Sequence, residues 1–177
     1  MAVDRTKEKK PAMKLIKPNL GIEDAGRNEV CEILNARLSD VFTLYTKTRK
    51  YHWNVRGKHF GQLHELFEEQ YTELEEEIDK IAERVRQLGG LAVGTLDEFK
   101  SLTQIEEQPG YNPNDIGMIR GLLDDHEMII RSFREDIDTA EAAKDTGTAD
   151  FLTACMEDHE KMAWMLRAHL EENDSSD

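Results

Sequence analysis

Residues 59–88 carry the clearest helical pattern in the chain. Their apolar side chains recur at spacings of three and four, which places them on one face of an α-helix. These residues are Phe60, Leu63, Phe67, Leu74, Ile78, Ile81, Val85 and Leu88. We therefore predict a long amphipathic helix from about His59 to Leu88, ended by the pair Gly89-Gly90.

Three other stretches show the same periodicity and predict helices over residues 25–55, 113–143 and 148–171. Asp24 and Thr148 are the expected N-caps of the first and the last of these. Thr95 and Glu98 form a capping box that predicts a short helix through about Leu102. No stretch of useful length shows the two-residue period of a strand. The sequence thus predicts an all-α fold, a four-helix bundle with a short helix between its second and third main helices.

Length and composition fit one domain. The chain has 177 residues, 38% of them hydrophobic, enough for a sizeable core, which we assign to residues 21–172. No apolar run is long enough to cross a membrane, and the opening residues lack the apolar segment of a secretory signal, so we expect a cytoplasmic protein. Cys31 and Cys155 have apolar neighbours and no metal-type spacing, which predicts buried, reduced thiols.

The charge is unevenly distributed. The formal net charge is −14, which argues against nucleic acid as the main partner and favours attraction of cations. Residues 1–20 differ, because six basic and two acidic residues give +4 (6 − 2), and Pro11 and Pro18 interrupt any helix. We predict a mobile basic arm over residues 1–20 and a frayed acidic tail over 173–177. Such an arm can bind DNA phosphates, but this attraction falls steeply with salt, so DNA is not the favoured partner.

A polar stripe borders the apolar face of the helix predicted over residues 59–88. His64, Glu68, Asp79 and Glu83 fall within an arc of roughly 100°. His64 and Asp79 are separated by about 22 Å along one helix, at about 1.5 Å per residue, which is too far to hold one ion together. If two copies of the helix pack antiparallel across a two-fold axis, His64 of one chain comes level with Asp79 of the other.

His52 completes this inferred site. It precedes Gly57 by five residues and His64 follows Gly57 by seven, so a hairpin brings both histidines to a similar height. The inferred site lies between subunits, with His52 and His64 from one chain and Asp79 and Glu83 from its mate. Two imidazoles with carboxylates suit Fe(II), Mn(II) or Zn(II). Against this stand two ordinary alternatives, in which acidic helix faces are solvated and a histidine beside an apolar stripe is a core residue.

The run Lys50-Tyr51-His52-Trp53-Asn54-Val55-Arg56-Gly57, followed by Leu63-His64-Glu65-Leu66-Phe67-Glu68 and Asp79-Lys80-Ile81-Ala82-Glu83-Arg84, closely resembles the signature of the Dps family of ferritin-like mini-ferritins. The resemblance extends over residues 28–170. It implies a ferritin-like four-helix bundle that forms a hollow dodecamer, with intersubunit ferroxidase sites that oxidise Fe(II), usually with hydrogen peroxide. Iron storage in the shell then protects against oxidative damage.

The resemblance also implies roles for single residues. His52, His64, Asp79 and Glu83 match the family's iron ligands, and Glu68 stands where members often have Asp. Trp53 matches a tryptophan beside the centre. Asp145 and Asp150 resemble the acidic residues of three-fold pores, although both also suit a helix N-terminus. Glu75 shares a face with His64 and Asp79, where it either helps to nucleate mineral or is a solvated carboxylate.

Other functions stay open from the sequence. One is a DNA-binding, nucleoid-protecting protein in which iron storage is secondary, and another is a purely structural helical oligomer. His126 and His159 lie on or beside inner stripes and are expected to be hydrogen-bonded core residues. No histidine has a glutamate three residues before it, unlike the internal di-iron bundles, and this absence favours a site between subunits.

Overall fold

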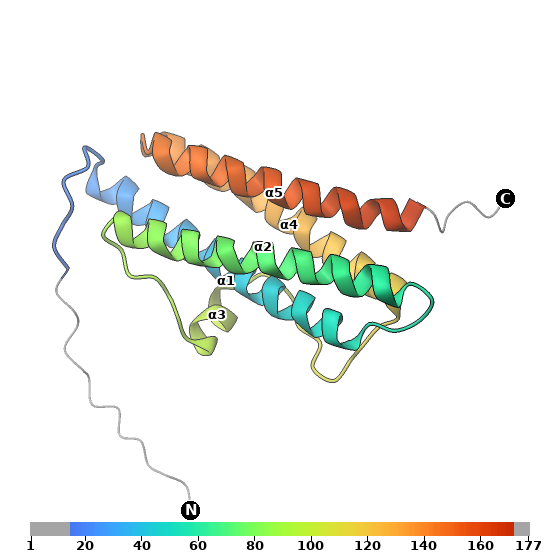
Figure 1. Ribbon diagram of the computed structural model, residues 1–177. Helices are drawn as coiled ribbons and strands as arrows, with labels where there is room; N and C mark the ends of the chain where they lie inside the picture. The colour runs from blue at the N-terminus through green and yellow to red at the C-terminus, as the bar shows by residue number, and fades with distance from the viewer. Residues whose placement is uncertain (1–14, 172–177) are drawn as a thin grey trace, which may run out of the picture.

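The computed structural model describes residues 15–171 (Figure 1). Most of the predicted basic arm and the whole predicted acidic tail lie outside these residues. The five helices are α1 (Asp24–Asn54), α2 (Phe60–Gln87), α3 (Leu96–Leu102), α4 (Asp115–Ala142) and α5 (Thr146–Glu171). Residues 15–171 contain no strand. The predicted fold class, with its short helix between the second and third main helices, is confirmed.

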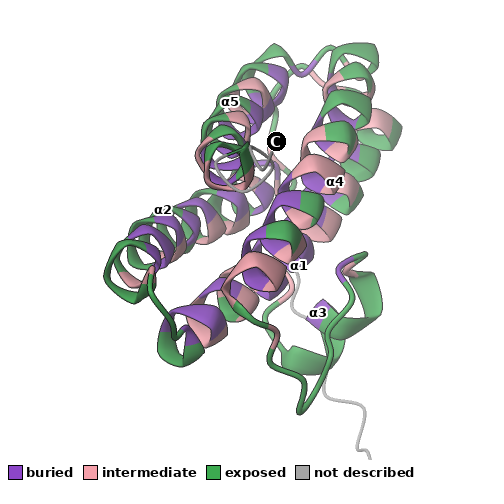
Figure 2. Ribbon diagram, turned by 90° about the vertical axis from the view of Figure 1, so that its right-hand side faces the viewer, coloured by how far each residue is buried: buried purple, intermediate pink, exposed green. Residues whose placement is uncertain are grey.

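The four long helices form two antiparallel hairpins that pack together. Helix α1 pairs with α2, α4 pairs with α5, and α1 also packs against α4 (Figure 1). Their buried faces turn toward one another, whereas the exposed faces point outward (Figure 2). The short helix α3 lies outside this bundle against α1, where the ring of Phe99 stacks on Phe42 with centroids 4.1 Å apart.

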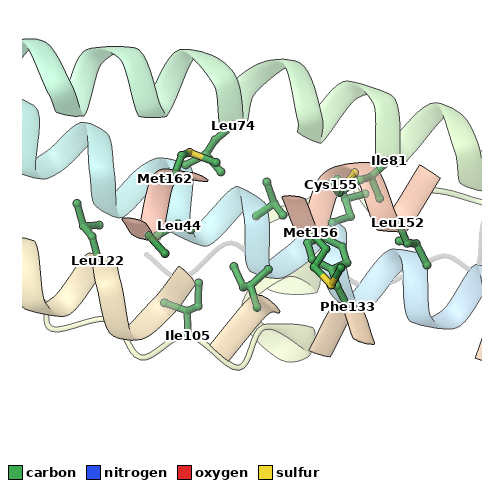
Figure 3. Packing of buried hydrophobic residues seen from close by; sticks show 14 of the residues in the cluster. Leu44, Leu74, Ile81, Ile105, Leu122, Phe133, Leu152, Cys155, Met156 and Met162 are labelled. Carbon is green, nitrogen blue, oxygen red and sulfur yellow. The ribbon is translucent and has the colours of Figure 1, made fainter. Parts of the chain in front are cut away.

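Apolar side chains from all four long helices fill the space between them (Figure 3). The largest fully buried side chains include Leu34 and Leu38 of α1, Phe67 of α2 and Phe133 of α4. Burial of each such side chain contributes about 1.5–3 kcal/mol. This core fixes the relative positions of α1 and α2, and therefore of the side chains at their shared edge.

The turn between α1 and α2 places the candidate site. Helix α1 ends at Asn54, and Gly57 adopts φ = 116°, a conformation that side chains with a Cβ rarely reach. The amide of Phe60 then donates to the carbonyl of Gly57 at 3.2 Å, and α2 starts there. This short connection turns α2 back along α1, as the sequence predicts.

Two predicted helix caps are wrong. Asp24 lies inside α1, where it pairs with Lys17 at 2.6 Å, and Glu23 precedes the helix without a side-chain cap. Thr148 lies inside α5, and it is the carboxylate of Asp145 that accepts the backbone N–H of Thr148 at 3.0 Å. Asp145 can cap because its oxygen reaches an amide three residues ahead.

Several smaller predictions are confirmed. The capping box of Thr95 and Glu98 opens α3. Cys31 and Cys155 are buried and free. Within residues 15–171, no helix combines the length and apolar character needed to span a bilayer.

Candidate metal centre

His52 and His64 meet at the edge of the α1–α2 hairpin. Their rings stack with centroids 3.8 Å apart and an interplanar angle of 19°. His52 is buried, whereas His64 is half-buried. The similar height predicted from their positions around Gly57 is therefore confirmed.

A reciprocal pair of hydrogen bonds orients both rings. Nδ1 of His52 lies 2.8 Å from the backbone oxygen of His64, and Nδ1 of His64 lies 2.9 Å from the backbone oxygen of His52. A carbonyl oxygen only accepts, so each Nδ1 carries a proton and donates. In a neutral imidazole that donates through Nδ1, the lone pair for a metal is on Nε2. Metal-binding histidines are commonly oriented in this way, through a hydrogen bond from the other ring nitrogen.

Glu68 adds a carboxylate to the two imidazoles. One ligand atom from each of His52, His64 and Glu68 lies within 4.8 Å of the other two. Glu68 is exposed at the surface of the subunit. No other set of three or more such side chains comes this close among residues 15–171. Two imidazoles and one carboxylate with open positions form a donor set typical of non-haem Fe(II) sites.

The other predicted ligands on α2 lie outside this cluster. Asp79 and Glu83 are exposed further along the helix, and Glu75 is also exposed. The rise of a helix separates Asp79 from His64 by about 22 Å, so these carboxylates do not complete the centre within one chain. One subunit brings together only His52, His64 and Glu68.

Asp145 and Asp150 occupy different environments at the start of α5. Asp145 is 3% exposed and pairs with Arg84 at 2.9 Å, and its second oxygen accepts the hydroxyl of Thr148. Through these contacts, Asp145 caps α5 and connects it to α2. Asp150 is exposed.

An aromatic cluster that the periodicity does not predict borders the three ligands. The ring of Tyr71 packs edge-on to His52 with centroids 5.2 Å apart, and its hydroxyl donates to Oε1 of Glu68 at 3.4 Å. Desolvation and then the charge of Glu68 raise the pKa of Tyr71. The guanidinium of Arg49 lies 5.1 Å from the Tyr71 ring and 5.6 Å from Tyr45. The i,i+3 spacing from Glu68 to Tyr71 is a sequence signal for their contact.

Trp53 lies at the outer side of this cluster. Its side chain is 67% exposed, and its ring faces the guanidinium of Arg49 at 5.7 Å. Within residues 15–171, the Trp53 ring does not stack on His52 or His64. Two aromatic side chains contact the candidate ligands instead: Phe60 stacks on His64 with centroids 5.1 Å apart, and Tyr71 contacts both His52 and Glu68.

A second histidine pair lies in the core, as predicted. His126 and His159 are fully buried, and their Nδ1 atoms are 2.8 Å apart. Nε2 of His159 lies 3.3 Å from the carboxylate of Glu77. Burial, and then the neighbouring His159, hold the pKa of His126 well below its ordinary value. These histidines join α4, α5 and α2, and the sequence does not indicate that they bond to each other.

Comparison with known proteins agrees with this architecture. The ferritin-like domain family matches residues 31–175. An uncharacterised low-temperature-induced protein of Nostoc sp. is 47% identical over 154 residues, which cover 86% of each chain. DNA protection during starvation protein 2 of Bacillus anthracis is 39% identical over 142 residues, covering 80% of this chain and 97% of that protein.

A solved structure shares the whole bundle. The Dps protein of Vibrio cholerae O1, described as a member of a broad superfamily of ferritin-like diiron-carboxylate proteins, is similar with a TM-score of 0.82 and 30% identity. The match covers 89% of this chain and 99% of that one. Since sequence and structure agree over nearly the full length of these relatives, the chain belongs to the Dps family of ferritin-like proteins.

Proposed function

We propose that this protein oxidises Fe(II), with hydrogen peroxide as the oxidant, and stores the Fe(III) product as mineral inside a hollow dodecamer. The observation that carries this proposal is the meeting of His52, His64 and Glu68, whose ligand atoms lie within 4.8 Å of one another while backbone carbonyls orient both rings through Nδ1. Iron is the substrate of this reaction. Its removal together with peroxide limits hydroxyl-radical formation and so protects the cell.

The proposed site is shared between two subunits. His52, His64 and Glu68 supply one half, and Asp79 and Glu83 of the partner subunit supply the other. Two features support this division. The three-residue cluster includes an exposed carboxylate, that of Glu68. Asp79 and Glu83 are exposed on the same helix as Glu68, at a distance that an antiparallel partner would bridge.

The donor set suits the proposed redox step. Each peroxide accepts two electrons, so two Fe(II) ions become Fe(III) while peroxide and two protons form two water molecules. Hard, anionic carboxylates favour Fe(III) over Fe(II), and neutral imidazoles bind the Fe(II) that enters. Open positions at the ions admit peroxide.

We assign weaker roles to three other acidic residues. Glu75 is exposed on α2, the helix of His64 and Glu68, where it can nucleate mineral. Asp150 is exposed at the start of α5 and suits a pore lining, while Asp145 supports that region through Arg84 and Thr148. Trp53 lies near the outer edge of the site and can shield it.

Iron oxidation tests the proposal directly. Anaerobic Fe(II) is mixed with peroxide, and the Fe(III) product is followed by absorbance for wild type, His52→Ala and Asp124→Ala. Asp124 is an exposed carboxylate on α4, so its variant is a control for removal of a polar side chain away from the proposed site. We expect fast oxidation by wild type and the control and slow oxidation by His52→Ala. Equal rates for all three proteins, or a wild-type rate equal to that of buffer, would reject the proposed site.

A further inference from the structure

We propose that Tyr71 is a redox-active residue, which donates one electron and one proton when peroxide meets a site that holds a single Fe(II). This inference rests on the proposed function and adds a catalytic residue to it. A ferroxidase site that holds only one Fe(II) cannot reduce peroxide completely. One Fe(II) supplies only one of the two electrons that peroxide needs, and the product of this incomplete reduction is the hydroxyl radical.

Contact with two candidate ligands selects Tyr71 for this role. Its ring lies against His52 with a centroid distance of 5.2 Å, and its hydroxyl lies 3.4 Å from Oε1 of Glu68. The other three tyrosines have no recorded contact with His52, His64 or Glu68 among the described hydrogen bonds and aromatic pairs. An electron leaving Tyr71 therefore crosses only one side-chain contact to reach the metal ligands.

The hydrogen bond to Glu68 also provides a route for the proton. A phenol that loses an electron becomes a strong acid, so its oxidation is easiest when a base already accepts its hydrogen bond. Oε1 of Glu68 is such a base. The carboxylate can pass this proton on to an oxygen atom of the peroxide beside it, which keeps electron and proton transfer together.

The reaction balances with hydrogen peroxide as the oxidant. Fe(II) and the phenol of Tyr71 give one electron each, the O–O bond breaks, and the phenol proton ends on one of the two oxygen atoms. The products are Fe(III), a neutral phenoxyl radical, one hydroxide and one water. A later Fe(II), with one proton, reduces the radical and restores the phenol.

The surroundings of Tyr71 hold its ring in place and extend the aromatic contact. Arg49 lies over the rings of both Tyr71 and Tyr45, and it donates to the hydroxyl of Tyr45. The rings of Tyr45 and Tyr71 meet edge-on with centroids 6.2 Å apart. Tyr71 is half-buried, so a radical there is partly protected from solvent.

Freeze-quench electron paramagnetic resonance tests this role. Protein loaded anaerobically with one Fe(II) per site is mixed with excess peroxide and frozen, and the same samples are assayed for Fe(III). We expect a phenoxyl radical in wild type and in Tyr111→Phe, whose exposed tyrosine lies in the α3–α4 connection. The radical should be lost in Tyr71→Phe, and a spin trap should then capture more hydroxyl radical.

A labelled residue provides a second measurement that does not depend on removing the hydroxyl. With 3-fluorotyrosine placed at position 71, the radical signal should gain splitting from the fluorine nucleus. A signal that persists in Tyr71→Phe, that disappears only in Tyr45→Phe, or that belongs to tryptophan would overturn the assignment. If wild type forms Fe(III) at the site but no phenoxyl radical, Tyr71 is not a donor and the ferroxidase proposal survives. If wild type does not oxidise iron with peroxide, both proposals fail.

Discussion

The molecule contains two histidine pairs that differ in their hydrogen-bond partners. At the hairpin edge, His52 and His64 each donate Nδ1–H to a backbone carbonyl, and one ligand atom of each ring lies within 4.8 Å of the Glu68 carboxylate. In the core, His126 and His159 bond directly to each other, and His159 faces the carboxylate of Glu77. One pair lies beside an exposed carboxylate and is the proposed metal centre, whereas the other connects three helices.

This difference is why we propose a metal centre at one pair and not at the other, although the two imidazoles lie close together in both. A metal-binding histidine uses one ring nitrogen as the ligand and donates the N–H of the other to a fixed acceptor. This hydrogen bond orients the ring so that the ligand nitrogen points at the metal. Exposure matters as well, because Glu68 can be reached from solvent whereas both core rings are fully buried. The two pairs should therefore respond to mutation in opposite ways.

Removal of a core histidine should have the largest effect. His159→Ala leaves a cavity and deprives the buried Nδ1 of His126 of its partner, so the free energy of unfolding should fall by about 3 kcal/mol. Denaturant unfolding followed by circular dichroism measures this loss. His64→Ala is the matched variant in the other pair and should cost about 1 kcal/mol or less. Comparable losses for the two variants would remove the distinction between the pairs.

Removal of a histidine from the hairpin-edge pair should instead affect metal binding. His52→Ala takes away one of the imidazole donors, and we expect the affinity for Fe(II) to fall by on the order of 100-fold. Anaerobic calorimetric titration measures the affinity. His126→Gln should bind Fe(II) like wild type, provided that it is folded. If His126→Gln loses affinity for Fe(II) and His52→Ala retains it, the proposed difference between the two histidine pairs is wrong.

Acid should destabilise the core pair. Because the pKa of His126 is lowered in the folded protein, the unfolded chain takes up a proton first as the pH falls below about 6.5. The contribution of His126 to the free energy of unfolding is therefore complete above about pH 6.5. Below that pH it decreases, with a slope of up to about 1.4 kcal/mol per pH unit.

Unfolding curves of wild type and His126→Gln between pH 7 and pH 5 measure this contribution by their difference. Subtraction is necessary because Asp136 acts with the opposite sign. Burial raises the pKa of Asp136 to about 6, so this group favours the folded state as the pH falls. A difference that does not change with pH would show that His126 is not the group responsible.

Neutralising the carboxylate of the edge cluster should have the smallest effect. Glu68→Gln keeps the shape of the side chain but removes its charge, and we expect Fe(II) affinity to fall by about fivefold, or about 1 kcal/mol. Glu65→Gln, an exposed neighbour on α2, is the control for loss of charge. If both variants bind Fe(II) equally well, Glu68 is not a ligand and the cluster is reduced to two histidines.

Much of this fold could be predicted from the sequence because its helices are long and periodic. The apolar stripe over residues 59–88 corresponds closely to α2, and the count of residues around Gly57 brings His52 and His64 together as expected. Local signals at helix ends were less decisive. Asp145 and Thr148 both suit an N-cap, and the structure shows that the carboxylate of Asp145 performs this role.

The details of the site depend on contacts that periodicity does not encode. Nothing in the pattern indicates that Nδ1 of His52 reaches the carbonyl of His64, since this depends on side-chain rotamers and on the exact turn. The bond between His126 and His159 joins helices through tertiary packing. The contact between Tyr71 and His52, on which the proposed role of Tyr71 rests, likewise depends on side-chain placement.

Complementation between subunits tests the shared site most directly. His52→Ala and Asp79→Ala are each assayed for peroxide-dependent Fe(II) oxidation, alone and as an equimolar mixture that has been dissociated and reassembled. A mixed dimer contains one site that has lost both ligands and one site that retains both. The account predicts two slow variants and a mixture that regains part of the wild-type rate. A mixture no faster than the mean of its components would contradict a site shared between two chains.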